Sequence, residues 1–188
     1  DVKAKFIPVV CQHCGNAPCE PVCPVYATYH NNEGLNVQVY NRCIGTRFCA
    51  NGCPYHVRFF NYWTPEWPDS LKNQLNPDVT VRTRGIMEKC TFCVQRIQRS
   101  TRESDRDGVE LKDGDRHLNP ACVNSCSTDA LIFGDWNDEN SKISKIKKEE
   151  YDKEGGRGYR LFENLGAAPN VIYLKKVEES TGDVDDHH

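Results

Sequence analysis

CIGTRFCANGCPY, residues 43–55, resembles an earlier stretch, CQHCGNAPCEPVCP, residues 11–24, in its cysteine spacing. The earlier stretch reads C-x2-C-x4-C-x3-C and is followed directly by Pro24. The later stretch keeps three cysteines and a following proline, but Thr46 stands where its second cysteine is expected. We therefore interpret the two stretches as an internal repeat of one ligand-bearing loop, with one ligand replaced in the second copy.

The composition of the chain narrows the classes of function that it can have. The chain has 188 residues and 11 cysteines, and an odd number argues against a closed set of disulfides. Tight C-x2-C pairs and C-P steps are typical of thiolate metal ligands, whereas secreted disulfide frameworks are usually shorter chains. The net charge of −3 lacks the basic footprint of a nucleic-acid binder. No apolar run approaches the ~18 residues of a membrane span, so membrane association would need a partner.

In paired ferredoxin runs, the first three cysteines of one run bind one cluster and the fourth binds the cluster of the other run. This rule predicts a 4Fe–4S site held by Cys11, Cys14, Cys19 and Cys53. It predicts a second site held by Cys23, Cys43 and Cys49. Because the second site has only three thiolates, we expect a 3Fe–4S cluster there, with Thr46 at the vacant corner. A four-iron cluster with water or hydroxyl on the odd iron is the alternative.

A second cysteine region supplies four further candidate ligands, Cys90, Cys93, Cys122 and Cys126. Taken alone, they could form one closed four-iron site or a four-cysteine zinc site, although their spacing fits zinc ribbons poorly. The ferredoxin rule instead assigns the first three to one cluster and sends the fourth to another cluster. Both of those clusters would need cysteines from a run that this sequence lacks.

Two histidines lie beside the candidate ligands, His13 inside CQHC and His56 after CPY. Histidine can replace cysteine on iron. Since the cysteines already complete the first site, we expect both histidines to lie beside a cluster or on the surface. The aromatic stretch YHVRFFNYW (residues 55–63) has two interpretations: packing that keeps water from the clusters, or a surface that docks a membrane partner.

The distribution of cysteines divides the chain into three parts. They are a two-cluster ferredoxin-like unit (1–63), the second cysteine region (64–134) and a covering C-terminal extension (135–188). Hydrophobic patterns predict short strands within 34–41, 130–134 and 170–177, a short helix after Cys93, a surface helix in 141–153 and helical spacing over 159–165. Residues 179–188 are expected to be disordered. The predicted fold class is α+β, ferredoxin-like and loop-rich.

Four stretches together resemble the multi-cluster iron–sulfur electron-transfer subunits of the polysulfide reductase and DMSO reductase type. They are CQHCGNAPCEPVCP, CIGTRFCANGCPY, MEKCTFCVQRI and ACVNSCSTDALIFGD. A narrower resemblance, to the iron–sulfur domain of the large subunit of alternative complex III, rests on Thr46, VRTRGIMEKCTFCVQRI (81–97) and GYRLFENLGAAPNVIYL (158–174). The resemblance covers roughly residues 6–178.

This resemblance implies three 4Fe–4S clusters and one 3Fe–4S cluster in a row. It implies a domain seated on a quinone-binding membrane subunit of the polysulfide reductase type, with c-type cytochromes and the rest of its own large subunit as neighbours. Electrons would pass from quinol toward a cytochrome or terminal oxidase, on the periplasmic side of the bacterial inner membrane.

The sequence departs from the family pattern at two places. An additional C-x2-C-x2-C run upstream is absent, so we expect a fragment, with one to three 4Fe–4S clusters. Ser127 stands where the family has proline, which should loosen the loop without removing a ligand.

The sequence therefore predicts an electron-transfer module of a quinol-oxidising respiratory complex that performs no catalysis by itself. An electron-transfer subunit of a molybdenum oxidoreductase and a structural metal-binding module are the alternatives. A radical enzyme is disfavoured because its C-x3-C-x2-C signature is absent.

Overall fold

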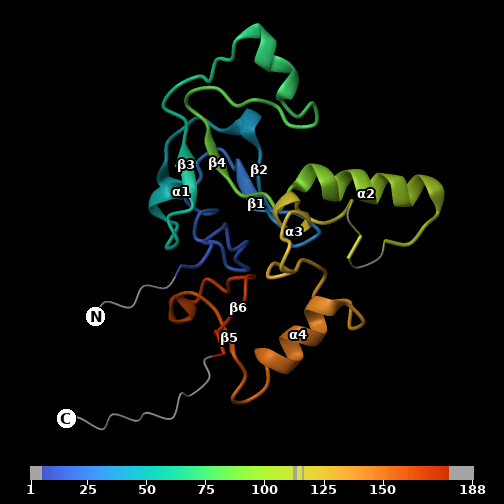
Figure 1. Ribbon diagram of the computed structural model, residues 1–188. Coiled ribbons are helices and arrows are strands. Elements are labelled where there is room, and N and C mark those ends of the chain that lie inside the picture. Colours follow the sequence, from blue (N-terminus) through green and yellow to red (C-terminus); the bar gives the residue numbers. More distant parts are fainter. Residues whose placement is uncertain (1–5, 112–113, 116, 178–188) are drawn as a thin grey trace.

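The computed structural model describes residues 6–111, 114–115 and 117–177 (Figure 1). Within these ranges, long loops join short strands and helices, as expected for a loop-rich α+β chain. The strands are β1 (Thr28–His30), β2 (Asn36–Gln38), β3 (Arg58–Phe60), β4 (Met87–Lys89), β5 (Gly158–Tyr159) and β6 (Tyr173–Leu174). The α-helices are α1 (Phe48–Asn51), α2 (Val94–Asp107), α3 (Ala121–Asn124) and α4 (Lys142–Glu150). Three short 3-10 helices are η1 (Tyr40–Arg42), η2 (Asp69–Gln74) and η3 (Glu163–Leu165).

The first hairpin pairs β1 with β2 in antiparallel register, with Tyr29 opposite Val37. Its turn is closed by Asn31, whose side-chain Oδ1 accepts the Leu35 N–H at 2.9 Å. Gly34 completes the turn at φ 77°, a conformation in which glycine meets no steric penalty. The strand expected within residues 34–41 is therefore present, as the second strand of this hairpin.

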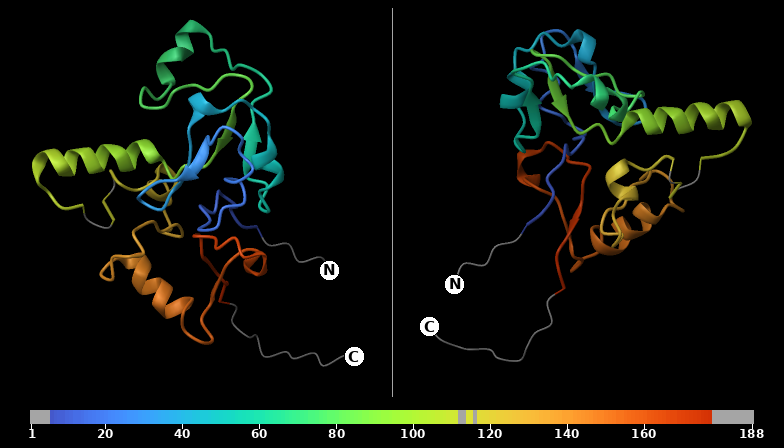
Figure 2. Two further views of the ribbon diagram at one scale, coloured as in Figure 1. Left: turned by 180° about the vertical axis from the view of Figure 1, so that it is seen from behind. Right: turned by 45° about the horizontal axis from the view of Figure 1, so that its top comes forward.

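The second hairpin brings together segments that are almost 30 residues apart in the sequence. Strand β3 pairs antiparallel with β4, and Arg58 lies opposite Lys89 in the register. Strand β4 also lies beside β2, so the two hairpins share one region of the molecule (Figure 2). This arrangement places Lys89, the residue before Cys90, next to the loop of the first cysteine run.

The C-terminal part returns to the first cysteine run. The Gly15 N–H donates to the Ala168 carbonyl at 2.7 Å, and the Asn170 N–H donates to the Gln12 carbonyl at 2.8 Å. Tyr55 also donates its hydroxyl to the Leu161 carbonyl at 3.2 Å. These bonds hold residues 161–170 against the loop that carries the first candidate ligands.

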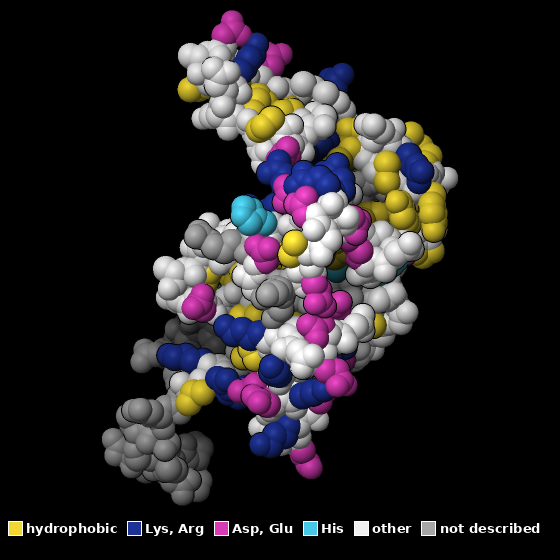
Figure 3. Space-filling model, turned by 90° about the vertical axis from the view of Figure 1, so that its right-hand side faces the viewer, with side chains coloured by type: hydrophobic (Ala, Val, Ile, Leu, Met, Phe, Trp, Pro, Cys, Tyr) yellow, Lys and Arg dark blue, Asp and Glu magenta, His cyan; other side chains and the backbone are white. Residues whose placement is uncertain are grey.

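Helix α2 projects away from the hairpins (Figure 1). It buries Ile97 and Ser100 and ends at Gly108, which adopts φ 63° as a left-handed C-cap. On the face from which α2 projects, basic and acidic side chains are interspersed rather than gathered into a patch of one sign (Figure 3). Helix α4 begins after Ser141, whose side chain accepts the Ser144 N–H at 3.1 Å.

Three expectations about secondary structure need correction. Residues 130–134 form no strand, because their backbone follows an irregular path after the turn at Cys126. Residues 159–165 do not form an α-helix, since Phe162 adopts φ 50° and only the 3-10 turn η3 follows it. Helix α2 extends over 14 residues and is longer than expected. Strand β6 is present within 170–177, and the predicted disorder at 179–188 lies outside the described residues.

The buried core contains few large aliphatic side chains. Its central cluster consists of Cys11, Cys14, Ala17, Cys19, Cys49, Cys53, Tyr55, Val57, Met87 and Ala167. Half of these residues are cysteines, and such a core gives small domains little stability without metal cross-links. Within the part of the chain that the structure describes, no helix is long and apolar enough to span a bilayer.

Candidate metal centres

One backbone feature recurs in three ligand turns. In each C-x2-C unit or its equivalent, the residue before the second ligand position has a left-handed conformation. These residues are His13 (φ 43°), Gly45 (φ 72°) and Phe92 (φ 54°). Thr46 therefore occupies the backbone position that Cys14 and Cys93 occupy in the other two turns. The left-handed residue before Thr46 is thus kept, while the backbone after it differs, because Arg47 is also left-handed (φ 64°).

A second turn follows the last cysteine of each run. Tyr26, His56 and Asp129 all adopt a left-handed conformation, with φ between 51° and 53°. Each donates its N–H to the carbonyl of the cysteine three residues earlier, at 3.3, 3.2 and 3.3 Å respectively. Ser127 lies inside the third of these turns, which keeps the form of the two turns that contain proline. His56 is exposed there and lines neither of the cavities described below.

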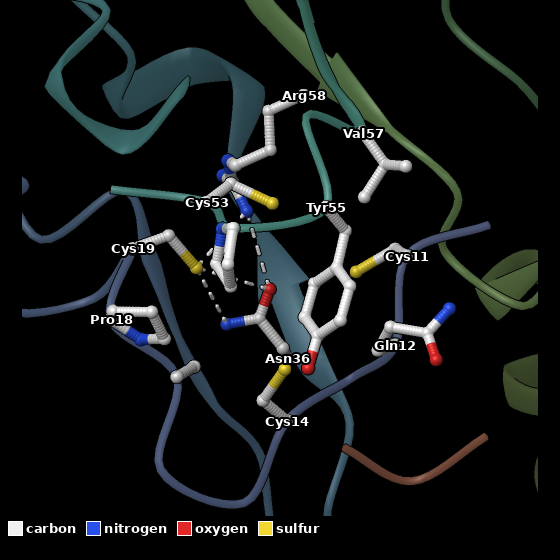
Figure 4. A pocket seen from close by; sticks show the side chains of 12 residues that line it. Cys11, Gln12, Cys14, Pro18, Cys19, Asn36, Cys53, Tyr55, Val57 and Arg58 are labelled. Carbon is white, nitrogen blue, oxygen red and sulfur yellow. Dashed lines mark hydrogen bonds between the residues drawn. The ribbon is translucent and has the colours of Figure 1, made fainter. Parts of the chain in front are cut away.

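The first cavity is lined by residues of both cysteine runs (Figure 4). Four thiols line it, and they belong to Cys11, Cys14, Cys19 and Cys53. All four cysteines are buried, and no carboxylate lines the cavity. The structure thus brings together the four residues that the ferredoxin rule groups into one site, three from the first run and one from the second.

Cations and amides on or beside the walls of the first cavity face the sulfur atoms of its cysteines. Lys89 Nζ lies 3.5 Å from Cys11 Sγ, and an Arg58 guanidinium nitrogen lies 3.4 Å from Cys19 Sγ. Asn36 also donates its side-chain N–H to Cys19 Sγ at 3.7 Å. Donors of this kind stabilise thiolate and cluster sulfur, so the cavity is suited to an anionic sulfur-rich group.

Burial disfavours the ionised form of the cysteine thiols in this cavity. Desolvation raises the pKa of Cys14 to about 11 and also raises the pKa of Cys19. Binding of a metal group would have to displace these protons, which is the usual coupling between metal binding and thiol ionisation. The same burial and the nearby Lys89 charge lower the pKa of His13 to about 2.

His13 is held as a neutral bridge between the two cysteine regions. Its Nδ1 accepts the Asn36 N–H at 3.2 Å, and its Nε2 lies 3.2 Å from the Cys90 carbonyl oxygen, to which it donates. Its ring stacks on Phe92 with 3.9 Å between centroids. Both ring nitrogens are therefore occupied by backbone groups, and His13 lies buried beside the first cavity with no lone pair free for iron.

The second cavity is lined by residues between 23 and 49 and by Met87. Its cysteines are Cys23, Cys43 and Cys49, and Thr46 lines it as well. Backbone N–H groups face two of the thiols, Ala27 N at 3.2 Å from Cys23 Sγ and Met87 N at 3.4 Å from Cys43 Sγ. Burial raises the pKa of Cys23, but the backbone donors around its sulfur outweigh burial and the net pKa is lowered.

The loop of the second cavity packs closely against the connector before β4. A Cβ atom at Gly45 would clash with the Gly85 carbonyl oxygen and press on the Phe60 ring. Gly45 therefore meets two demands, a left-handed backbone and a close approach to another segment. Thr46 is exposed on this loop, so the position of the missing fourth ligand of the second cavity is open to solvent.

The second cysteine region keeps the ligand turns but is more open. Cys93 Sγ accepts the Ala121 N–H at 3.4 Å, and Cys126 Sγ accepts the Ala130 N–H at 3.2 Å. The Thr128 hydroxyl and nearby backbone N–H groups lower the pKa of Cys126 to about 7. Cys122 is exposed and Cys90 is half-buried. Cys90, Cys93 and Cys122 thus lie near one another without the enclosure seen around the first cavity.

Across the described residues, no three Cys, His, Asp or Glu side chains converge closely enough to hold one metal ion. A structural zinc site requires four ligands converging on a single point. The thiols of the first cavity are instead spread around its walls (Figure 4). Such a spread suits ligands that bind different iron atoms of one cluster.

Sequence reasoning missed the two cations of the first cavity, Arg58 and Lys89. A signal was present in MEKC, where strand alternation places Met87 and Lys89 on one face and Glu88 on the other. Different residues of the aromatic stretch 55–63 fit its two interpretations, packing against the clusters and an exposed docking surface. Tyr55 and Val57 are buried against the first cavity, whereas Trp63 is 71% exposed.

Comparison with known proteins agrees with this geometry. Residues 2–68 match the model of the 4Fe-4S dicluster domain. The chain is 43% identical over 177 residues to the iron-sulfur cluster-binding subunit of menaquinone reductase from Nitratidesulfovibrio vulgaris, covering 92% of this chain and 66% of the relative. It is 39% identical over 176 residues to iron-sulfur subunit 1 of the Hdr-like menaquinol oxidoreductase from Archaeoglobus fulgidus, covering 92% and 58%.

A third relative is matched over more of its own length. The chain is 33% identical over 203 aligned residues to the arsenate respiratory reductase iron-sulfur subunit ArrB from a Shewanella species, covering 93% of this chain and 77% of the relative. The chain thus spans 58–66% of the length of the first two relatives. These matches confirm the expected 4Fe–4S clusters and the expected role in electron transfer rather than catalysis. The chain belongs to the family of iron–sulfur electron-transfer subunits of reductase complexes.

Proposed function

We propose that the two cavities hold two iron–sulfur clusters that carry single electrons through this chain. The observation that carries the proposal is the crossing of the two runs. Cys53 of the second run lines the cavity of the first run, and Cys23 of the first run lines the cavity of the second. Such crossing is the ligand pattern of two-cluster ferredoxins. When bound, the clusters supply one-electron chemistry, and the protein supplies thiolate ligands, hydrogen bonds to sulfur and exclusion of water.

For the first cavity, we propose a 4Fe–4S cluster held by Cys11, Cys14, Cys19 and Cys53. For the second, we propose a 3Fe–4S cluster held by Cys23, Cys43 and Cys49. The support for three irons is that Thr46 occupies a ligand position but offers a hydroxyl, which is a poor ligand for iron. A four-iron cluster with solvent on the odd iron is the alternative, and the solvent exposure of Thr46 is compatible with it.

The second cysteine region is proposed to complete further 4Fe–4S clusters with cysteines from outside this sequence. Its ligand turns match those of the first runs, but its thiols are only partly enclosed. Because the chain spans 58–66% of the length of two relatives, such cysteines could belong to a longer polypeptide. This would give up to three 4Fe–4S clusters beside the 3Fe–4S cluster.

We further propose that the chain works in a complex that exchanges electrons with quinol. Two relatives are named for menaquinone or menaquinol, which supports a quinone-binding membrane subunit as a partner. Several large apolar side chains within and shortly after the second cysteine run are exposed and could meet that partner, and they are Ile44, Phe48, Tyr62 and Trp63. The narrower assignment to alternative complex III, with c-type cytochromes and a periplasmic location, rests on the sequence resemblance at Thr46, 81–97 and 158–174.

A molybdenum reductase is the second candidate for the parent complex. The match to an arsenate respiratory reductase subunit favours it. Purification of the native complex separates the candidates through its other subunits. A molybdenum-containing subunit would support a reductase, whereas c-type haem without molybdenum would support alternative complex III.

The proposed clusters are tested by anaerobic purification followed by iron, sulfide and zinc analysis and a redox titration. We expect a brown protein with at least seven irons per chain, four for the first cavity and three for the second, which takes up electrons one at a time. A colourless, zinc-containing protein without redox transitions would contradict the proposal and favour a structural metal module.

A further inference from the structure

Two buried cations lie opposite one another in the second hairpin. Arg58 on β3 and Lys89 on β4 are register partners, and only 5% and 8% of their surfaces are exposed. Like charges directly opposite in an antiparallel pair destabilise a sheet, and burial of each charge adds a desolvation cost. A buried pair of this kind calls for a compensating anion.

No carboxylate among the described residues supplies that anion. Glu88, between Met87 and Lys89, forms its salt bridge with Arg82. The polar partners of Arg58 are the side-chain oxygens of Asn36 and Gln38, which are neutral. Lys89 Nζ donates to the Cys90 carbonyl at 3.0 Å and otherwise faces Cys11. What the two cations share is that each points at a thiol of the first cavity.

Arg58 lines the first cavity and also lies near a cysteine of the second cavity, Cys49. Its guanidinium donates to Cys19 Sγ of the first cavity at 3.4 Å. Burial alone would lower the pKa of Arg58, but the charges of Cys19 and of Cys49 in the second cavity raise it. Its Nε is buried and has no hydrogen-bond partner among the described groups. A guanidinium that donates to one thiol, lies close to a second thiol and leaves one donor unused is placed to interact with sulfur in both cavities. Of the two cavities, Lys89 approaches a thiol of the first, Cys11, and its charge also acts on Cys90 of the second cysteine region.

An iron–sulfur cluster with its thiolates is an anion, and reduction adds one more negative charge. Nearby buried cations therefore favour the reduced form, because interactions between charges are strong where water is excluded. We propose that Arg58 and Lys89 are a cation pair that raises the reduction potentials of the two clusters, Lys89 acting on the first cluster alone and Arg58 on both. The inference rests on the proposed function, which places clusters in these two cavities.

The test compares two neutral variants, Lys89→Met and Arg58→Gln, by redox titration followed by electron paramagnetic resonance of each cluster. Lys89→Met is expected to lower the reduction equilibrium constant of the first cluster at least tenfold, which is 59 mV for a one-electron couple. The second cluster should change less than twofold. Arg58→Gln is expected to lower the equilibrium constants of both clusters at least threefold.

Matched variants separate charge from structure. Lys89→Arg and Arg58→Lys keep the charge and should restore potentials to within about twofold of the wild type. Arg106→Gln removes the same charge from an exposed site near the end of α2 and should leave both clusters unchanged. A purely structural role would not produce shifts that follow charge and that differ between the two clusters.

Potentials that stay within twofold of the wild type in both neutral variants would overturn the inference. If the neutral variants fail to assemble clusters, the iron content of the charge-keeping variants tests the inference instead. Clusters retained in both charge-keeping variants would support the need for a compensating cation, and clusters lost there too would overturn it. Failure of the proposed function gives a different result, because the wild-type chain itself would then show no redox-active cluster.

Discussion

The first two cysteine runs and the second cysteine region contain similar turns but enclose their cysteines to different degrees. The left-handed residue before the second ligand position is present in all three units, as is the left-handed residue after the last cysteine. In the first two runs these turns face each other across enclosed cavities. In the second region the same turns leave Cys122 exposed.

This difference separates what a short sequence specifies from what the tertiary structure adds. Each turn is defined by hydrogen bonds within about five residues, so it forms wherever the motif occurs. Enclosure needs a second run on the opposite side, together with β4 and residues 161–170 from elsewhere in the chain. The first region has these partners and the second lacks a facing run within this sequence.

The sharpest test of the comparison removes one thiol from each region. Cys19→Ala should abolish the first cluster and unfold the unit around it, because half of the central core is cysteine and depends on metal cross-links. Cys122→Ala, at an exposed position, should leave the iron of the first two cavities unchanged. Iron content and protease resistance measure both effects. Equal losses of iron in the two variants would contradict the distinction between the regions.

A second prediction concerns the odd ligand turn. Thr46→Cys restores a thiol at a ligand position, so the second cavity should bind four irons instead of three. Iron analysis should rise by about one iron per chain, and the resonance signal of an oxidised three-iron cluster should disappear. Thr46→Ser is the control and should keep three irons. A Thr46→Cys protein that retains the three-iron signal after iron-replete reconstitution would show that Thr46 is not the vacant corner.

The close approach around Gly45 predicts a smaller effect. Gly45→Ala forces a left-handed alanine and a clash with the Gly85 carbonyl, at a cost of about 1–3 kcal/mol. Gly108→Ala is the matched control, because Gly108 has a similar φ of 63° and nothing within 4 Å. Its cost should stay near 1 kcal/mol. Thermal unfolding of the cluster-loaded protein measures both, and equal shifts would mean that the packing against Gly85 contributes nothing.

The smallest expected effect is at the turn that lacks proline. Ser127→Pro should stabilise the second region by about 0.4–1 kcal/mol, since the turn there already matches the turns that contain Pro24 and Pro54. Hydrogen exchange of residues near Ala130 reports the change, which should not reach the first two cavities. Faster exchange in the variant would indicate that the third turn differs from the other two.

Much of the candidate site could be predicted from the sequence, because each ligand loop is formed by residues that are close together in the sequence. The cysteine spacing predicted which thiols the structure places in each cavity, and it located Thr46 at a ligand position. The cations Arg58 and Lys89 could not be predicted from that pattern, since their meeting depends on the pairing of β3 with β4. The strand expected at 130–134 was wrong because a short apolar run forms a strand only where a partner strand is available.

The most direct test of the account is a low-temperature electron paramagnetic resonance spectrum of the oxidised, anaerobically purified protein. The account predicts a narrow, nearly isotropic signal from one three-iron cluster per chain, assigned to Cys23, Cys43 and Cys49, beside 4Fe–4S clusters that give signals only after reduction. A spectrum without this signal, from protein that contains its full complement of iron, would contradict the assignment of a vacant corner at Thr46.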